Sequence, residues 1–361
     1  MISENQQPFR VHQFHHSVSP FDGISYQMFF IQSALKKIGV SGSIFASELH
    51  GISAPRAFKF SKEKIWDCDL LLIHHSHGNP HLIELSHVEI PKALVYHNIV
   101  LPHFFRHDLM MAELSQLGRK QLSSLRKETI ASFTGSEFNL EELTKHHFPH
   151  PQILPIMDLS RDLGQPKQKK LRSRKDAPKN ILFVGRVCPH KNQALLIKTF
   201  FYLKKNLPKQ SKLILLGGQD PIYTEYLKLL IKQWGLHQDV KLTGNVNSKS
   251  LEQAYETADA MVCVSEHEGF CIPLVEAMSR QVPVFFLPKT GVKETMGKSG
   301  VALNTEDPME ISEIIYSCLI APQAISTILK SQDQRLKVLA SQHNAQKLQE
   351  TLLNLLERLR T

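Results

Sequence analysis

The sequence predicts an α/β protein made of two doubly wound, Rossmann-like domains, and three observations support this fold class. Short apolar runs that suit buried strands recur along the chain, and segments with helical periodicity separate them. A basic, proline-containing stretch interrupts this alternation near the middle of the chain. The length of 361 residues also fits two domains of ordinary size.

The first half of the chain supplies the elements of the first domain. An apolar stretch at 9–14 leads into a turn-rich loop at 17–23 and a helical segment at 24–38. Strands are expected at 44–46, 70–74, 93–96 and 131–134, and a long helix is expected at 109–127. Strands that alternate with helices form parallel sheets covered on both faces. Residues 1–165 are therefore predicted to form an N-terminal domain.

Lysine and arginine dominate residues 166–179, which also contain Pro166 and Pro178. A run of like charge with proline is typical of a solvated linker. We therefore place the boundary between the two domains in this stretch.

The second half repeats the alternation more clearly. Strands are expected at 180–185, 212–218, 240–242, 260–264 and 282–287, with helices at 192–207, 223–234, 251–257 and 273–279. This pattern predicts a second domain over residues 180–330. The remaining residues, 331–361, are expected to form a helix that packs back on the N-terminal domain, because their leucines are spaced for one apolar face.

Composition excludes some classes of protein and leaves others open. The net charge of +9 favours anionic partners such as nucleic acid, acidic lipid or a nucleotide diphosphate. The five cysteines are odd in number and widely spaced, which argues against a disulfide framework, and Cys263 and Cys271 are expected to be buried as small apolar side chains. The polar start and the lack of a long apolar run predict a cytoplasmic protein.

One strand-to-helix junction of the second half carries two cations. Gly185 ends an expected strand, and Arg186 and Lys191 follow in the loop before the next helix. The carboxyl ends of such strands bind ligands, and helix N-termini there favour phosphate groups. Arg186 offers a fork of donors and Lys191 a point charge, which together suit a diphosphate, although a basic surface loop would give the same pattern.

A second junction carries two carboxylates. Glu268 lies in the loop after the strand at 260–264, and Glu276 lies in the helix that follows. Carboxylates in this position are well placed to accept hydrogen bonds from the hydroxyl groups of a sugar or a ribose. Gly269 lets a ligand approach the backbone closely.

Together these two junctions resemble glycosyltransferase family 4. The resemblance rests on Glu268 and Glu276 within EGFCIPLVEAM, on the upstream GRVCPHKN, and on the segment 240–260, and it covers most of residues 180–305. It implies the GT-B fold, in which two Rossmann-like domains face each other across a cleft. It also implies a hexosyltransferase that transfers a sugar from a nucleotide donor, UDP- or GDP-linked, with retention of configuration and without a metal or other cofactor.

The resemblance also implies roles for individual residues. Arg186 and Lys191 would hold the donor diphosphate and stabilise the leaving group, Glu268 would contact the donor sugar, and Glu276 would bind the ribose. The other expected donor contacts are Gly185, the backbone at Gly269, Phe270 and Cys271, the base neighbours Asn245 and Val246, and Gly23 in a glycine loop of the first domain.

The segment around His97 points to a narrower group within the family. Tyr96-His97-Asn98-Ile99 resembles bacterial enzymes of surface-polysaccharide assembly, including lipopolysaccharide, although Val100 and Leu101 replace an expected Thr-Pro. The resemblance would place His97 near the transferred sugar, whereas a core or capping histidine is the alternative. It also implies a glycan or lipid-linked acceptor and a peripheral contact with the anionic inner membrane face, through the linker or through Arg119, Lys120, Arg126 and Lys127.

Five other histidines of the first half cluster in sequence: His15, His16, His74, His75 and His77. No carboxylate or thiol pattern accompanies them, so the sequence does not favour a metal site here. Contact with the acceptor, a structural role or no role remain open.

Three alternative functions share these features. A sugar-nucleotide epimerase of the same fold would use the same donor site, and a non-catalytic binding protein would keep the site without transfer. Nucleic-acid binding by the basic linker is disfavoured because no aromatic residues are interleaved with its charges. The sequence does not predict the donor base or sugar, the acceptor, the linkage or the oligomeric state.

Overall fold

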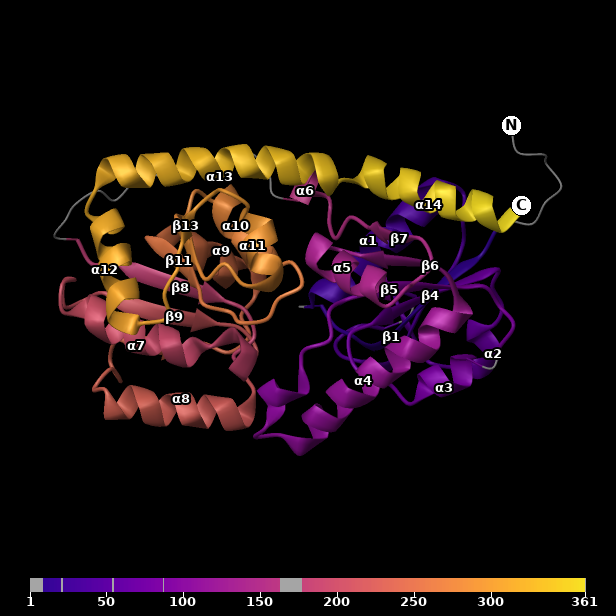
Figure 1. The fold of residues 1–361 in the computed structure, drawn as a ribbon, viewed down its shortest axis with the longest axis horizontal. Helices are drawn as coiled ribbons and strands as arrows, with labels where there is room; N and C mark the ends of the chain where they lie inside the picture. Colours follow the sequence, from indigo (N-terminus) through magenta and orange to yellow (C-terminus); the bar gives the residue numbers. More distant parts are fainter. Residues whose placement is uncertain (1–8, 21, 54, 87, 163–176, 361) are drawn as a thin grey trace. The chain divides into compact units, whose positions relative to one another are not determined.

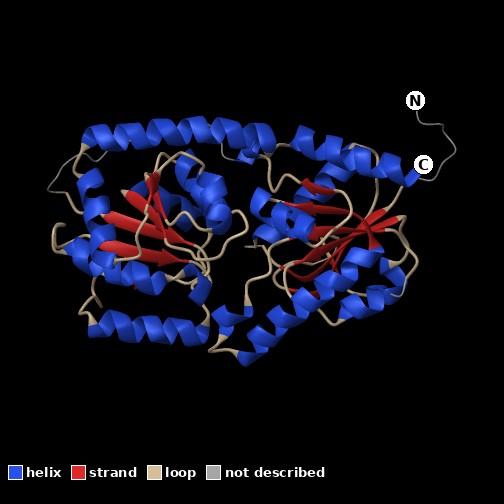
Figure 2. Cartoon of the chain, viewed as in Figure 1, coloured by secondary structure: helices blue, strands red, loops and turns tan. Residues whose placement is uncertain are grey.

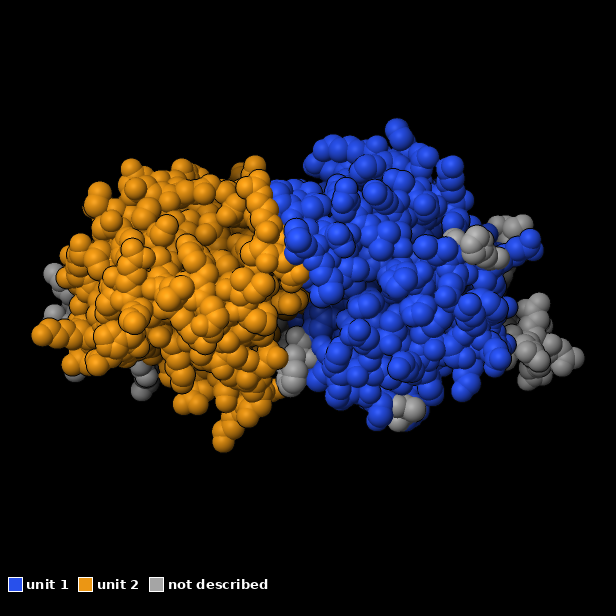
Figure 3. All heavy atoms as spheres, turned by 90° about the horizontal axis from the view of Figure 1, so that it is seen from below, with its two compact units in different colours: residues 1–103, 109–162, 340–361 blue, residues 104–108, 163–339 orange. Residues whose placement is uncertain are grey.

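The computed structural model describes residues 9–20, 22–53, 55–86, 88–162 and 177–360. They belong to two compact units (Figure 3). Unit 1 comprises residues 1–103, 109–162 and 340–361, and unit 2 comprises residues 104–108 and 163–339. Residues 166–176 of the predicted linker lie outside the described part of the chain.

Each unit contains one parallel sheet with helices packed around it, as Figures 1 and 2 show. The predicted fold class, two Rossmann-like domains, is therefore confirmed.

The described residues of unit 1 form a seven-stranded sheet in the order β3-β2-β1-β4-β5-β6-β7. The strands are β1 Val11–Val18, β2 Ile44–Leu49, β3 Phe58–Lys59, β4 Leu70–His75, β5 Lys92–Tyr96, β6 Thr129–Thr134 and β7 Pro151–Ile153. The chain builds outward from β1 to β3 and then returns to place β4 on the other side of β1. Ligands of doubly wound sheets bind at such a reversal, beside the carboxyl ends of the strands.

The central strands of unit 1 were predictable because they are buried on both faces. All residues of β4 and β5 are buried, and a parallel strand covered on both sides is a continuous apolar run. The edge strands β3 and β7 were missed, since they are short and only partly buried. Strand β1 was predicted at 9–14 but runs to Val18, so it includes His15 and His16.

Helices flank the sheet of unit 1: α1 Gly23–Lys37, α2 Lys62–Ile65, α3 His81–Ser86, α4 Leu109–Glu128, α5 Glu137–Lys145, α6 Leu159–Asp162 and α14 Ala345–Arg360. The short 3-10 turn η1 Pro102–Phe105 precedes α4, and its last two residues belong to unit 2. The helices α1 and α4 match their predicted ranges within one residue at each end. Asp22 caps α1, because its carboxylate accepts a hydrogen bond from the Ser25 N–H at 2.9 Å.

The described residues of unit 2 form a six-stranded parallel sheet in the order β10-β9-β8-β11-β12-β13. The strands are β8 Asn180–Val184, β9 Lys212–Leu216, β10 Val240–Leu242, β11 Ala260–Cys263, β12 Val284–Phe286 and β13 Val301–Ala302. The helices are α7 Gln193–Lys204, α8 Pro221–Gln233, α9 Ser248–Thr257, α10 Ile272–Ser279, α11 Thr290–Met296, α12 Pro308–Leu319 and α13 Pro322–Gln342. A short 3-10 turn, η2 Pro189–Lys191, precedes α7. Here the strand order reverses between β8 and β11, and both predicted junctions follow these two strands.

The predicted single helix over 331–361 is wrong, because the chain forms two helices there. Helix α13 ends at Gln342 and α14 begins at Ala345. The break is stabilised by Asn344, whose side-chain oxygen accepts a hydrogen bond from the Lys347 N–H at 2.8 Å. His343, in the same break, accepts a bond from the Leu159 N–H at 3.0 Å through its carbonyl oxygen.

Helix α14 completes the core of unit 1 from the far end of the sequence. Leu348, Leu352, Leu355 and Leu356 are buried in a cluster that includes residues of α1, β1, β4, β5 and β6. The helical spacing of these leucines produces the apolar stripe that the sequence predicted.

No single helix of the described ranges has the length and apolarity to cross a membrane. Helix α12 and the stretch 322–359, which contains α13 and most of α14, pass that test as a pair, but the chain bends by 95° between them.

Two adjacent leucines of α14 provide a matched test of this packing. Leu352→Ala should lower the free energy of unfolding of unit 1 by about 2–5 kcal/mol, because it empties a buried site. Leu353→Ala should change it by less than about 0.5 kcal/mol, because Leu353 is 42% exposed. Urea unfolding followed by circular dichroism measures both, and equal effects would contradict the packing of α14.

Candidate donor-binding site

The first junction of unit 2 depends on glycine. Gly185, directly after β8, has φ +148°, and Gly217, directly after β9, has φ +143°. A side chain at Gly217 would overlap the carbonyl oxygen of Gly185, so the carboxyl ends of the two strands approach each other as only glycine allows. The Val187 N–H then donates to the Gly218 carbonyl at 2.7 Å and extends the pairing beyond the strands.

The loop after Gly185 is shaped by the start of helix α7. Asn192 adopts a left-handed conformation with φ 53° and caps the helix, where its side-chain oxygen accepts from the Leu195 N–H at 3.4 Å. Gln193, the first residue of α7, donates from Nε2 to the carbonyl of Arg186 at 2.9 Å. These contacts fix the backbone that carries Arg186 and Lys191.

The two cations of this loop lie in different surroundings. The ammonium of Lys191 contacts Glu268 Oε1, and their side chains are only 17% and 9% exposed. Burial disfavours the charged ammonium, but the Glu268 carboxylate outweighs it and raises the pKa of Lys191. The exposed guanidinium of Arg186 has no partner among the described residues. Lys191 therefore joins the first junction to the second, while Arg186 is free to bind an anion.

The second junction is held by residues that sequence reasoning missed. The Glu268 N–H donates to Thr290 Oγ1 at 2.9 Å, and the Gly291 N–H donates to the Glu268 carbonyl at 3.0 Å. A side chain at Gly291 would overlap the carbonyl of Gly269. The sequence held a signal for this third junction, since Thr290 and Gly291 are the first two residues of α11, the helix that follows β12.

Glu276 lies in α10 and is bound by a neighbouring helix. The Tyr255 hydroxyl of α9 donates to Glu276 Oε2 at 2.9 Å, and Arg280 lies over the Tyr255 ring with 4.9 Å to its centroid. Burial raises the pKa of Glu276, and the hydrogen bond from Tyr255 and the charge of Arg280 offset part of this effect. One oxygen of Glu276 thus has a protein donor, which fixes the orientation of the carboxylate.

The other predicted donor contacts differ in how they are presented. The Phe270 side chain is buried and its carbonyl accepts from Thr295, so Phe270 serves the core. Cys271 caps α10 with φ 71°, and among the described residues its N–H has no partner. Asn245 follows β10 and lies beside Gly218, where a Cβ would be 3.1 Å from Asn245 Oδ1, and Val246 follows it.

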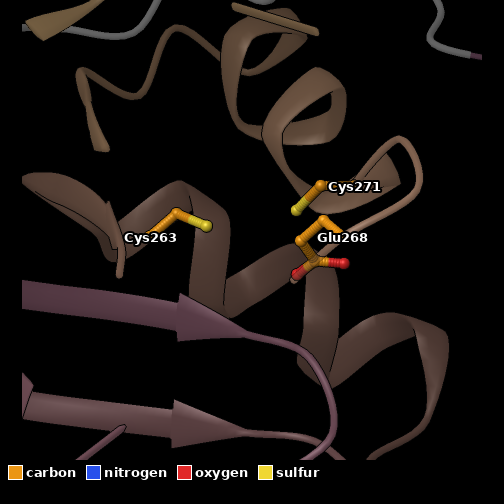
Figure 4. Close-up of side chains that lie close together, drawn as sticks. All are labelled: Cys263, Glu268 and Cys271. Atoms are coloured by element: carbon orange, nitrogen blue, oxygen red, sulfur yellow. The ribbon is translucent and has the colours of Figure 1, made fainter. Parts of the chain in front are cut away.

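Cys263 and Cys271 were expected to be buried as small apolar side chains. Cys263 is buried as expected and Cys271 is partly buried, but their surroundings are not purely apolar. The ligand atoms of Cys263, Cys271 and Glu268 all lie within 4.8 Å of one another (Figure 4). Cys263 also donates to Ser265 Oγ at 3.4 Å. Two thiols and a carboxylate are ligands that zinc prefers, but a cation here would lie beside the Lys191 ammonium, and like charges at that separation repel. The arrangement therefore favours the ion pair over a metal.

Two predicted residues belong to unit 1 rather than to unit 2. Gly23 is the first residue of α1, beside the capping carboxylate of Asp22. His97 follows β5, and its Nε2 lies 2.8 Å from His74 Nδ1. Two other clustered histidines make contacts within unit 1: His75 Nε2 donates to the Gly118 carbonyl at 2.8 Å, and His15 Nε2 lies 3.0 Å from Ser76 Oγ.

Two units of doubly wound topology, with charged side chains beyond the strand ends of the second, define the GT-B class of fold. The HepE protein of Anabaena, solved in complex with UDP and glucose, is similar over 97% of this chain and 100% of its own, with a TM-score of 0.72 and 17% identity. At that identity the similarity shows the fold alone.

Sequence comparison identifies the domain that carries the site. Residues 165–337 match the family model described as glycosyl transferases group 1, so this part of the chain is a group 1 glycosyltransferase domain. The predicted resemblance is therefore confirmed.

Two curated relatives illustrate the family. An N-acetylgalactosamine-N,N'-diacetylbacillosaminyl-diphospho-undecaprenol 4-alpha-N-acetylgalactosaminyltransferase of Campylobacter jejuni is 31% identical over 47% of this chain and 45% of its own length. The O-antigen chain mannosyltransferase B of Escherichia coli is 28% identical over 38% of this chain and 36% of its own. The chain thus spans less than half the length of these relatives.

The raised pKa of Glu276 predicts that its carboxylate destabilises the folded state at neutral pH. A carboxyl group whose pKa is higher in the folded than in the unfolded state destabilises the fold once it ionises. Glu276→Gln, which still accepts from Tyr255, should therefore raise the free energy of unfolding at neutral pH. The gain should vanish as the pH falls below the ordinary pKa of 4.5, where both states are protonated. Urea unfolding at a series of pH values tests this, and a variant less stable than wild type at neutral pH would contradict it.

Proposed function

We propose that this protein is a retaining glycosyltransferase that moves a hexose-type sugar from a nucleotide-sugar donor to a glycan or lipid-linked acceptor. The observation that carries the proposal is the pairing of Lys191 with Glu268, which joins two strand-to-helix junctions within the group 1 domain. A UDP- or GDP-linked donor would bind there without a metal or other cofactor.

Each residue of the site then has a chemical role. Arg186 and Lys191 bind the diphosphate and stabilise the negative charge that develops as it leaves. Glu268 accepts hydrogen bonds from the sugar, and Glu276, oriented by Tyr255, accepts them from the ribose. The backbone at Gly185 and from Gly269 to Cys271 approaches the phosphates, and Asn245 and Val246 contact the base.

Retention would follow from attack on the face that the leaving group departs from. The bond between the anomeric carbon and the phosphate oxygen breaks, the bond to the acceptor oxygen forms, and the hydroxyl proton passes to the departing phosphate. No carboxylate of the site is assigned as a covalent nucleophile, because Glu268 is assigned to the sugar hydroxyls and Glu276 to the ribose.

The identity of the acceptor rests on the relatives. The Campylobacter enzyme is named for a diphospho-undecaprenol acceptor and the Escherichia coli enzyme for the O-antigen. We therefore place this protein in cell-surface polysaccharide synthesis, such as that of lipopolysaccharide, in the cytoplasm and at the inner membrane face.

The donor site is tested first by a calorimetric and thermal-shift screen of UDP-, GDP- and ADP-sugars. One nucleotide series should stabilise the protein by mass action. Glu276→Ala should weaken that ligand by about 10- to 100-fold, because hydrogen bonds to a charged group contribute about 1.5–3 kcal/mol. Glu225→Ala is the matched control, since Glu225 is exposed and contacts only Lys228 among the described residues.

The same screen separates the alternatives. The absence of binding by any series, with or without magnesium, would refute the donor site. Binding without transfer to any acceptor preparation would favour a non-catalytic binding protein, and release of an epimerised free sugar without acceptor would favour an epimerase.

Helix α4 is the surface we propose for the membrane contact. Its first turn exposes Leu109 by 77% and Met110 by 66%, and Lys120 and Lys127 are exposed further along. Leu109, Lys120 and Lys127 fall on one face at helical spacing, which suits the interface of an anionic bilayer. Arg119 contributes less, because it pairs with Glu142 at 2.8 Å.

Vesicle sedimentation tests this contact. Binding should require anionic lipid, and the double substitution Lys120→Glu with Lys127→Glu should reduce it at least tenfold, at about 1 kcal/mol per cation. Equal binding to neutral and anionic vesicles would remove the proposal.

A further inference from the structure

Three polar side chains, joined by hydrogen bonds, cross the sheet of unit 1 where its strand order reverses. We call this series the hydrogen-bond chain. Gln13 lies in β1, His74 in β4 and His97 directly after β5, and these strands are neighbours in the sheet. His74 Nε2 lies 3.0 Å from Gln13 Oε1, and His74 Nδ1 lies 2.8 Å from His97 Nε2. Gln13 and His74 are buried, so water does not replace these bonds.

The hydrogen bond between Gln13 and Met28 fixes which atom donates in each of the other two hydrogen bonds. Gln13 Nε2 lies 3.0 Å from the carbonyl oxygen of Met28, which can only accept. The amide nitrogen of Gln13 must therefore face Met28, and its oxygen must face His74. His74 Nε2 then carries a proton and donates to that oxygen.

The position of the ring proton can then be assigned for His74 and for His97 in turn. Burial, followed by the charges of neighbouring histidines, lowers the pKa of both His74 and His97, so both rings are neutral at neutral pH. A neutral ring protonated on Nε2 has a lone pair on Nδ1. His74 Nδ1 therefore accepts, and His97 Nε2 must donate to it. The proton on His97 is thus fixed at Nε2, which leaves a lone pair at Nδ1.

No other described residue bonds to His97 Nδ1. His97 is only partly buried, whereas the two residues behind it are buried. The chain of hydrogen bonds therefore ends in an acceptor nitrogen at the carboxyl edge of the sheet, beside the reversal where doubly wound sheets bind ligands.

We propose that Gln13 and His74 are positioning residues that hold His97 in the Nε2-protonated form, so that Nδ1 accepts a hydrogen bond from a substrate hydroxyl. The nature of that substrate, a sugar, rests on the proposed function. A lone pair attracts a hydroxyl proton and repels a phosphate oxygen. The His97 end of the hydrogen-bond chain therefore selects a hydroxyl group over a phosphate.

The protonation state is tested without any substrate. Histidine-selective ¹⁵N labelling and long-range ¹H–¹⁵N correlation distinguish protonated from unprotonated ring nitrogens, and the His97 signals are those that His97→Gln removes. We expect an unprotonated Nδ1 and a protonated Nε2 in the wild type. A proton on Nδ1 would overturn the proposal, whatever the enzyme does.

Gln13→Met tests the role of the chain. It removes the acceptor of His74 Nε2, so His74 should move its proton to Nδ1 and donate to His97 instead. His97 would then carry its proton on Nδ1, turn from acceptor to donor, and lose the substrate hydroxyl. We expect the reversed ¹⁵N pattern and a fall in kcat/KM of about 10- to 100-fold, with the affinity for the free nucleoside diphosphate unchanged.

His75→Gln is the matched control. His75 is a buried histidine of β4, as His74 is, but its side chain bonds to the Gly118 carbonyl and takes no part in the hydrogen-bond chain. It should leave the His97 signals and transfer unchanged at a temperature where all variants are folded. A reversed pattern in Gln13→Met with undiminished transfer would overturn the positioning role. If the wild type transfers no sugar, the proposed function fails, and the ¹⁵N pattern alone decides the assignment of the acceptor nitrogen.

Discussion

A single buried ion pair organises the candidate site. Lys191 reaches from the loop before α7 to Glu268 in the loop before α10, and so connects two junctions that are far apart in sequence. Removing either partner would leave an unpaired charge with little access to water, which costs far more than the pair contributes. The pair also depends on the glycines of both junctions, because they let the two loops approach closely enough for the side chains of Lys191 and Glu268 to meet.

This constraint also shapes the ligand chemistry. A lysine already neutralised by a carboxylate offers less net positive charge than a free one, so the unpartnered Arg186 provides much of the local attraction for an anion. The pair instead fixes where the carboxylate oxygens of Glu268 lie. A preorganised carboxylate accepts sugar hydroxyls without first being ordered, which is how rigid sites gain affinity.

The sequence predicted the fold well where burial or backbone geometry dictates the residue type, whereas the roles of the donor-site residues stay predictions. The strands β4, β5, β8 and β9 are apolar because they are covered on both faces, and Gly185, Lys191 and Glu268 stand where the junctions require them. Edge strands such as β3 lack that signal.

The tertiary relations could not be predicted, because they depend on which elements become neighbours. Thr290 supports Glu268 across 22 residues of sequence, and Gln13 reaches His74 across 61. The thiols of Cys263 and Cys271 lie beside Glu268 for the same reason, although local composition suggested an apolar setting. The break between α13 and α14 depends on Asn344, a single cap within a continuous helical pattern.

The placement of α14 has a consequence for how the chain is made. Unit 1 begins at the N-terminus, yet its core takes four leucines from the last sixteen-residue helix. During synthesis the first half leaves the ribosome long before these leucines exist, so unit 1 must wait with part of its apolar surface uncovered while unit 2 is translated and folds. The domain that is synthesised first is therefore completed last, and a chain that stops short of its final helix would be a target for chaperones and proteases rather than a slightly shorter enzyme.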